Sequence, residues 1–299
     1  MKNYYKKTKI IFVIQLVILR HILLIKKINT KVCLCTFGKK ENLYAKEFVE
    51  HYKRYGVDKI FIYDNNDLND EYFDEVISEY IKNGYVKIIN YRGKNKIQLK
   101  AIKNCYKNNF RKYDWFLFYD MDEFIYLKYI YNVKLFLNRK EFDDCKIILL
   151  NWVHRSDNEL LYYDNRSLFT RFKKRGKKIK YAIDVKPILK SRSKIIINNV
   201  HFINKKIKQC DGFGRKKYYN GIYDKNPDYK FYYLDHFYTK STEEFINKIK
   251  RGSIAFGPGK RFNILKNYFD INRITLEKIN YIERALNINL SDYITKTNP

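Results

Sequence analysis

The chain has 299 residues, of which 45% are hydrophobic and 31% are charged, so it can bury a sizeable core and is not a disordered chain. Lysine and arginine number 61 against 32 acidic residues, and the formal net charge of +29 favours partners that carry phosphate, such as nucleic acid, anionic lipid or phosphorylated substrates. No repeat period or low-complexity segment occurs, which excludes solenoid and collagen-like folds.

A strongly apolar run, IIFVIQLVILRHILLI, occupies residues 10–25 between two groups of lysines. Arg20 and His21 interrupt the run, and a helix over this range would span only about 24 Å, which is short for a membrane span. Residues 1–30 are therefore predicted to form a basic and apolar helix that either lies on an anionic membrane surface or packs on the rest of the chain. No small-residue cleavage site follows, so a removed signal peptide is not expected.

Predicted strands and helices alternate from residue 31 to residue 120. The strands are expected at VCLCTF (32–37), KIFIYDNND (59–67), YVKIIN (85–90) and DWFLFYD (114–120), and the helices at 42–55, 71–82 and 95–111. Strands separated by helices of this length predict parallel pairing with right-handed crossovers, which is a doubly wound α/β arrangement. Ligands of such sheets bind at the carboxyl ends of the strands, near residues 36–41, 64–67 and 120–123.

The alternation breaks beyond residue 127. Strands are expected at CKIILLNWV (145–153), KYAIDVKPILK (180–190) and KIIINNVHFI (194–203), and helices at about 241–251, 261–268 and 275–287. The basic run at 166–190 is interpreted as a solvated strand face. Because no linker rich in Pro, Gly or Ser separates the halves, residues 31–252 are predicted to be one domain with a mixed sheet, followed by a helical extension at 253–299.

Five cysteines occur, an odd number, and none belongs to a C-x-x-C pair. This spacing predicts neither a disulfide framework nor a zinc site, so we expect reduced, buried thiols. Cys33 and Cys35 are two residues apart in a predicted strand, and their side chains should therefore point to the same side of the sheet.

The segment YDMDEF at 119–124 ends a buried aromatic strand in three carboxylates. In an extended segment, Asp120 and Asp122 project to one side while Met121 points to the other. Two carboxylates at this spacing can hold Mg²⁺ or Mn²⁺, and the cation can bridge to a diphosphate. Such a cation would neutralise the charge that develops on a departing nucleoside diphosphate, as sugar transfer requires.

Several segments together resemble a known family. They are KVCLCTFGKKENLYAKEFVEHYKRYGVDKIFIYDNND, NGYVKIINYRG, QLKAIKNCY, YDWFLFYDMDEF and LDHFYTKSTEEFINKIKRG. In register over about residues 31–252, they resemble the catalytic domain of the family 2-like and family 92-type glycosyltransferases of GT-A fold. The resemblance implies an enzyme that transfers a sugar from a nucleotide-sugar donor, a UDP-sugar, to a cell-surface or lipid-linked glycan.

The resemblance also implies roles for individual residues. Asp120 and Asp122 would form the D-x-D site for Mn²⁺ or Mg²⁺, and His236 would be the ligand from the C-terminal side, with His201 as its rival. The residues that would contact the donor are Thr36, Glu41, Asp64 and Asp120.

Lys248 and Arg251 are three residues apart on a predicted helix and therefore share a face. Two cations there could hold a diphosphate, or they could belong to a solvated basic surface.

Sugar transfer with inversion needs a general base, usually a carboxylate, that takes the proton of the acceptor hydroxyl. Asp157 in NWVHRSDN and Asp211 in QCDGFG are the candidates, both after strands of the second half. Asp157 is preferred because Trp152 lies upstream and could form a platform for a sugar.

Two other functions compete with glycosyl transfer. The charge and the 17% aromatic content also suit a metal-dependent nucleic-acid enzyme, or a non-catalytic protein that binds polyanions at a membrane surface. No nucleic-acid-binding motif is present, so nucleic acid is not the expected partner. The expected location is the cytoplasm, with peripheral membrane contact. Dinucleotide, P-loop, serine-hydrolase and zincin motifs are absent.

Overall fold

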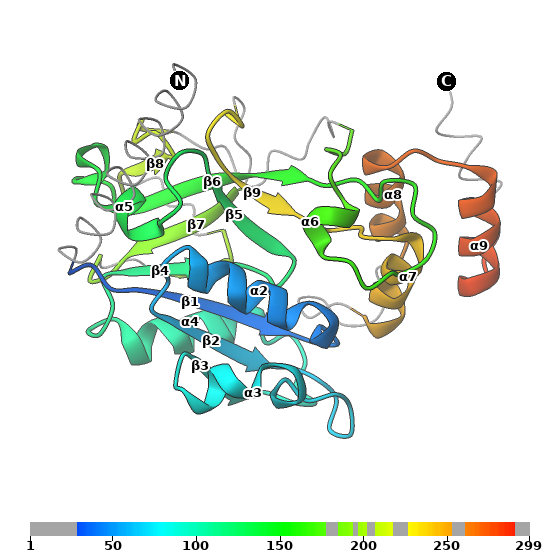
Figure 1. Cartoon of the computed structure of the whole chain (residues 1–299), viewed down its shortest axis with the longest axis horizontal. Coiled ribbons are helices and arrows are strands. Elements are labelled where there is room, and N and C mark those ends of the chain that lie inside the picture. The colour runs from blue at the N-terminus through cyan, green and yellow to red at the C-terminus, as the bar shows by residue number, and fades with distance from the viewer. Residues whose placement is uncertain are drawn as a thin grey trace, which may run out of the picture.

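The computed structural model describes residues 29–177, 185–193, 197–201, 207–217, 227–252 and 261–290. They form a mixed α/β structure in which helices cover a large mixed sheet (Figure 1). The predicted N-terminal helix lies outside these residues. None of the helices in the described part has both the length and the hydropathy needed to cross a membrane.

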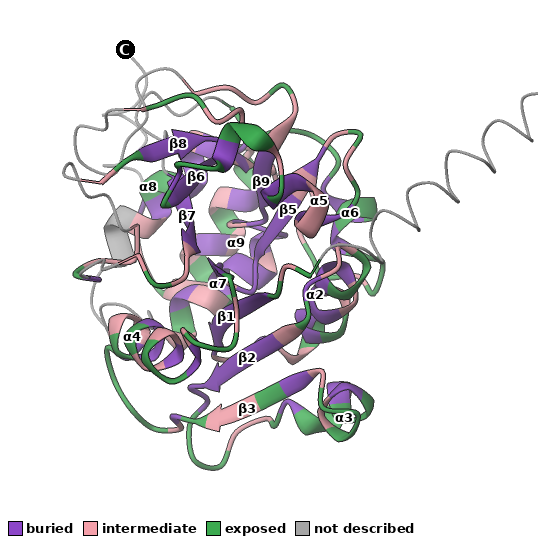
Figure 2. Ribbon diagram, turned by 90° about the vertical axis from the view of Figure 1, so that its left-hand side faces the viewer, coloured by how far each residue is buried: buried purple, intermediate pink, exposed green. Residues whose placement is uncertain are grey.

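The first half of the chain is the parallel arrangement that the sequence predicted. Its strands, in the spatial order β3-β2-β1-β4, are β1 (Val32–Gly38), β2 (Lys59–Asp64), β3 (Val86–Asn90) and β4 (Trp115–Phe118). Its helices are α2 (Asn42–Arg54), α3 (Asp74–Lys82) and α4 (Gln98–Asn109). Figure 2 shows α2 and α3 on one side of these strands and α4 on the other.

The second half extends the same sheet in the order β4-β7-β6-β9-β5, with β8 beside β6. These strands are β5 (Glu123–Leu127), β6 (Ile147–His154), β7 (Val185–Lys190), β8 (Gln209–Asp211) and β9 (Tyr232–His236). Antiparallel pairing begins at β7, which lies between β4 and β6. The strand predicted at 194–203 is wrong for residues 197–201, which form no strand; Ile197 there is buried in the core, so packing explains the apolar residue without sheet pairing.

Short helices connect these strands, and longer ones follow them. They are α5 (Val133–Leu137), a 3₁₀ turn (Lys140–Phe142), α6 (Leu168–Arg171), α7 (Thr242–Arg251), α8 (Arg261–Ile271) and α9 (Leu276–Leu286). Side chains of α7, α8 and α9 share one apolar cluster. A capping box begins α7, where Ser241 accepts from the backbone N–H of Glu244 and the Glu244 side chain accepts from the Ser241 N–H.

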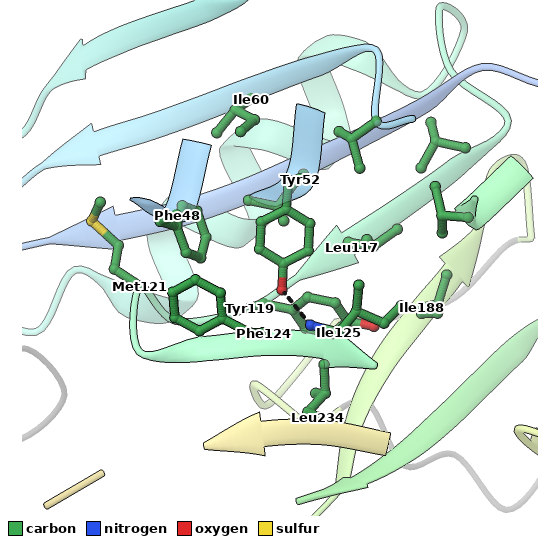
Figure 3. Close-up of a cluster of buried hydrophobic side chains, with 14 of the residues drawn as sticks. Phe48, Tyr52, Ile60, Leu117, Tyr119, Met121, Phe124, Ile125, Ile188 and Leu234 are labelled. Atoms are coloured by element: carbon green, nitrogen blue, oxygen red, sulfur yellow. Dashed lines mark hydrogen bonds between the residues drawn. The ribbon is translucent and has the colours of Figure 1, made fainter. Parts of the chain in front are cut away.

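Side chains of β1 divide between two apolar clusters, one on each face of the sheet. Val32 and Leu34 pack toward α2, whereas Cys33 and Cys35 pack on the face of α4, as their spacing predicted. Figure 3 shows Tyr52 of α2 reaching β5 through the first cluster. Its hydroxyl donates to the Glu123 carbonyl oxygen at 2.7 Å and accepts from the Ile125 N–H at 3.2 Å. These bonds fix the start of β5.

Two disulfides link distant segments, so the prediction of reduced thiols is wrong for four of the five cysteines. Cys35–Cys105 joins β1 to α4, and Cys145–Cys210 joins the segment before β6 to β8. Cys33 is a buried free thiol. The partners are 70 and 65 residues apart, and only the folded topology brings them together. The disulfides argue against the cytoplasmic location expected from the sequence.

Candidate functional site

The acidic segment at 119–124 lies in a tight turn between β4 and β5. The Glu123 N–H donates to the Asp120 carbonyl oxygen at 3.0 Å, and the Asp120 N–H donates to the Glu123 carboxylate at 3.0 Å. The extended geometry predicted for Asp120 and Asp122 is therefore wrong, because residues 121–122 form the turn. At the end of β1, Gly38 leaves room for this turn, since a Cβ there would lie 2.6 Å from Met121 Sδ.

Three buried side chains converge behind the turn. Asp122, Glu123 and His236 each place one potential ligand atom within 4.8 Å of the others. The register of the sheet produces this arrangement, because Glu123 of β5 pairs with His236 of β9, and His236 pairs with His154 of β6. Asp122 and His236 are thus brought together as predicted, and Glu123, not Asp120, is the third member of this group.

Ionisation in this group is set by burial and by neighbouring charges. Burial opposes the charged form of Asp122, but the Lys248 ammonium at 2.8 Å and His236 hold the pKa of that carboxyl well below its usual range. Burial raises the pKa of Glu123 well above its usual range and lowers the pKa of His236, which keeps that imidazole neutral. A neutral imidazole retains a lone pair that can bind a metal.

The residues present fit a divalent cation. Among the described residues, His236 Nδ1 is buried without a hydrogen-bond partner, and Glu123 Oε1 is buried with the Lys186 ammonium at 3.2 Å as its ion-pair partner. His236 Nε2 lies 3.6 Å from Asp122 Oδ1. Carboxylate oxygens together with one imidazole suit Mn²⁺ or Mg²⁺.

Lys186, which the sequence did not single out, is buried between two of the carboxylates. Its ammonium lies 2.9 Å from Asp120 and 3.2 Å from Glu123. Burial disfavours the charge, but these two carboxylates outweigh it and raise the pKa of Lys186 above its usual value. The interpretation of the basic run 166–190 as a solvated face is therefore wrong at Lys186, since the central position of β7 in the sheet turns this side chain inward.

The cations predicted on α7 also point inward. Lys248 donates to Asp122 at 2.8 Å and to the Tyr238 carbonyl oxygen at 3.0 Å. Arg251 lies 2.6 Å from Glu41, and the buried ammonium of Lys240 lies 3.3 Å from the same carboxylate. Lys248 contacts Asp122 and Arg251 contacts Glu41, so neither side chain belongs to a solvated basic surface.

Two further predicted donor residues lie at the ends of β1 and β2. Thr36 is fully buried, and its hydroxyl has no hydrogen-bond partner in the described part of the chain. Asp64 pairs with Arg92 at 2.8 Å and accepts from the Asn66 N–H at 2.9 Å. Arg92 also donates to backbone carbonyls of the loop that follows β2, so this pair fixes the loop.

The two candidate bases contact other parts of the molecule. Asp157 accepts from the Tyr268 hydroxyl at 2.8 Å and pairs with Lys278 at 2.5 Å, which ties its loop to α8 and α9. Asp211 pairs with Arg215 at 2.7 Å and accepts from backbone N–H groups of its own turn. No contact in the described structure joins either carboxylate to the group at Asp122.

Trp152 and His154 of β6 lie beside His236, and His154 was not predicted from the sequence. The ring centroid of His236 lies 4.3 Å from that of Trp152 and 5.0 Å from that of His154. Burial lowers the pKa of His154 to about 3, so its imidazole is neutral. His201, the rival to His236, directs Nδ1 to the Val185 carbonyl oxygen at 2.7 Å. Strand alternation from Trp152 could have identified His154.

Comparison with known proteins gives a family match and several similar structures. The family model of glycosyltransferase family 92 matches residues 29–275. S. aureus TarS is 11% identical over 86% of this chain and 49% of its own, with a TM-score of 0.37, so this chain spans about half of that protein. TarS 1–349 in complex with UDP-GlcNAc is 10% identical over 90% of this chain and 76% of its own, with a TM-score of 0.39. A search of curated proteins finds no match.

Proposed function

The chain belongs to glycosyltransferase family 92, and we propose that it transfers a sugar from a UDP-sugar to a hydroxyl group of a cell-surface or lipid-linked glycan with the help of a divalent cation. The observation that carries the metal-dependent part is the buried group of Asp122, Glu123 and His236. It lies just after β4, on the side where the parallel strands end, and ligands of α/β sheets bind there.

Asp122, Glu123 and His236 would hold Mn²⁺ or Mg²⁺. When bound, the cation would supply positive charge to a departing diphosphate. The lowered pKa values of Asp122 and His236 favour the ionised carboxylate and the neutral imidazole that a metal site requires, and a bound cation would oppose the burial that raises the pKa of Glu123. Asp120 would contact the donor, and its carboxylate is held by the Lys186 ammonium at 2.9 Å.

Nearby cations would contact the diphosphate from the other side. Lys248 forms an ion pair with Asp122, and Arg251 forms one with Glu41, so both cations are held at the site before a ligand binds. If a phosphate oxygen of the donor binds to Lys248 or Arg251, that cation would contact both the phosphate and its carboxylate partner, Asp122 or Glu41. Thr36 and Asp64, at the ends of neighbouring strands, are proposed to line the nucleotide side of the same site.

The acceptor side retains Asp157 and Asp211 as proposed general bases for an inverting transfer. Asp157 Oδ1 accepts from the Glu159 N–H, while Oδ2 contacts Tyr268 and Lys278. To accept a proton from an acceptor hydroxyl, Asp157 would therefore have to give up one of these contacts, for example that with Tyr268 or with Lys278. The contacts of both aspartates also suit a purely structural role, and Asp157→Asn separates the two roles, because a structural residue would change the melting temperature as well as the rate.

The test is release of UDP from UDP-glucose, UDP-galactose and UDP-GlcNAc, measured with Mn²⁺ and again with excess chelator. We expect turnover of at least one donor, its loss with chelator, and a fall of about a hundredfold or more in Asp122→Asn. Asp144→Asn is the matched control, because the Asp144 side chain is 82% exposed and its ion-pair partner is a surface lysine. Equal activity with and without chelator in the wild-type chain would overturn the metal-dependent proposal.

A further inference from the structure

Several buried polar atoms beside the proposed metal group have no protein partner. They belong to Trp152 Nε1, to both ring nitrogens of His154, and to Nδ1 of His236, counted over the described residues. An indole N–H or imidazole that is buried without a partner is rare in folded proteins, because each such group forfeits a hydrogen bond to water. The proposed cation accounts for His236 Nδ1 but not for the three atoms of Trp152 and His154, which indicate that something else binds there.

The cluster is built by two adjacent strands. Trp152 and His154 are two residues apart in β6 and therefore share a face, and β9 places His236 directly opposite His154. Figure 1 shows β6 and β9 running side by side at this place. Lys186 lies 5.6 Å from the centre of the Trp152 ring and so joins the cluster to Asp120 and Glu123.

The composition of the cluster identifies a class of ligand. An indole face offers a flat apolar surface, and a neutral imidazole offers one donor and one acceptor. Trp152 and His154 are each partly exposed as residues, although their ring nitrogens are buried. A pyranose ring has an apolar face and a rim of hydroxyl groups, and it satisfies both kinds of surface at once.

We propose that Trp152 and His154 recognise the sugar that is transferred, with Trp152 packing against its ring and His154 hydrogen-bonding to one of its hydroxyl groups. The inference rests on the proposed function and adds the residues that select the sugar. The position follows from covalent connectivity, because the transferred sugar is bonded to the diphosphate, and the diphosphate would lie at His236. The Trp152 ring centroid is 4.3 Å from that of His236.

The test compares ligands that differ only in the sugar. Titration calorimetry with Mn²⁺ gives dissociation constants for UDP and for UDP-glucose, UDP-galactose and UDP-GlcNAc. For His154→Ala and Trp152→Ala we expect the constant for UDP to stay within twofold, while that for the preferred UDP-sugar rises about tenfold, the loss of one hydrogen bond or one ring contact. His154→Gln, which keeps a donor and an acceptor, should restore most of the affinity.

Each other outcome has a definite meaning. Equal weakening of UDP and UDP-sugar by His154→Ala overturns the proposal, because His154 would then act through the diphosphate or the metal. Unchanged binding of every ligand overturns the proposal too. In that case either ordered water or the acceptor glycan would bind the ring nitrogens. If the wild-type chain binds neither UDP nor any UDP-sugar, the proposed function itself fails. Melting temperatures within a few degrees of wild type show that each variant is folded.

Discussion

Replacing Lys186 by Met removes the cation that lies between Asp120 and Glu123 and should destabilise the fold strongly. The ammonium is 2.9 Å and 3.2 Å from the two carboxylates, and its side chain is 3% exposed. At these distances and an effective dielectric constant of about 20, each attraction amounts to about 5 to 6 kcal/mol. The variant no longer carries the cost of burying an ammonium group, and Glu123 can take up a proton. The expected net loss of stability is therefore about 3 kcal/mol, near the range for breaking a buried ion pair.

Urea unfolding without reductant measures this loss through the shift in free energy of unfolding. Lys208→Met is the matched control, since its partner Asp144 lies at the same 3.2 Å on the surface, with side chains 40% and 82% exposed. We expect a loss of less than about 1 kcal/mol for the control. The double change Lys186→Met with Glu123→Gln should recover part of the stability. A loss for Lys186→Met no larger than that of the control would show that the buried ion pairs do not stabilise the fold.

Three further outcomes are expected from the sequence and the structure. After denaturation without reductant, a thiol reagent should modify one cysteine per chain, Cys33, and labelling of all five would show that the disulfides do not form. Burial lowers the pKa of His51 to about 3, so the neutral form stabilises the fold above the unfolded value of about 6.5 and this contribution is lost as the pH falls toward 3. Between pH 6.5 and 4.5 the wild-type chain should lose about 2 to 3 kcal/mol more than His51→Gln, and parallel losses would contradict this cause. Residues 2–27 should carry the chain to anionic liposomes in flotation assays, less so at high salt, and equal flotation of a chain that starts at Asn29 would exclude that role.

Local patterns were enough to predict the parallel half of the sheet. Buried apolar runs indicated β1 to β4, and apolar residues at helical spacing indicated the helices between them. In each element the apolar residues mark the face that is buried, so no contact with another segment was needed to recognise it. The strand β5 was missed since it begins at a charged residue, Glu123, immediately after a turn. The run at 194–203 was misread because burial of Ile197 against the α4 face produces the same apolar pattern as a strand.

Residues of the candidate group could be named from the sequence where a single segment carries a motif, and they could not where pairing between segments decides which side chains meet. Asp122 and His236 could be named from their own motifs. The positions of Glu123 and Lys186 depend on the register of β5, β9, β6 and β7, which a single sequence does not encode in any local pattern. The disulfide partners were missed for the same reason, because their spacing along the chain carries no information about their contact.

Titration of UDP into the chain with and without Mn²⁺, for the wild type, Glu123→Gln and Asp120→Asn, tests whether Asp122, Glu123 and His236 hold the cation. We expect that Mn²⁺ strengthens UDP binding by the wild type, that Glu123→Gln loses at least about tenfold of that gain, and that Asp120→Asn keeps the Mn²⁺-dependent gain. UDP binding that is independent of Mn²⁺ in the wild type would contradict the metal site. Loss of the gain in Asp120→Asn alone would return the metal to the pair of aspartates that the sequence first indicated.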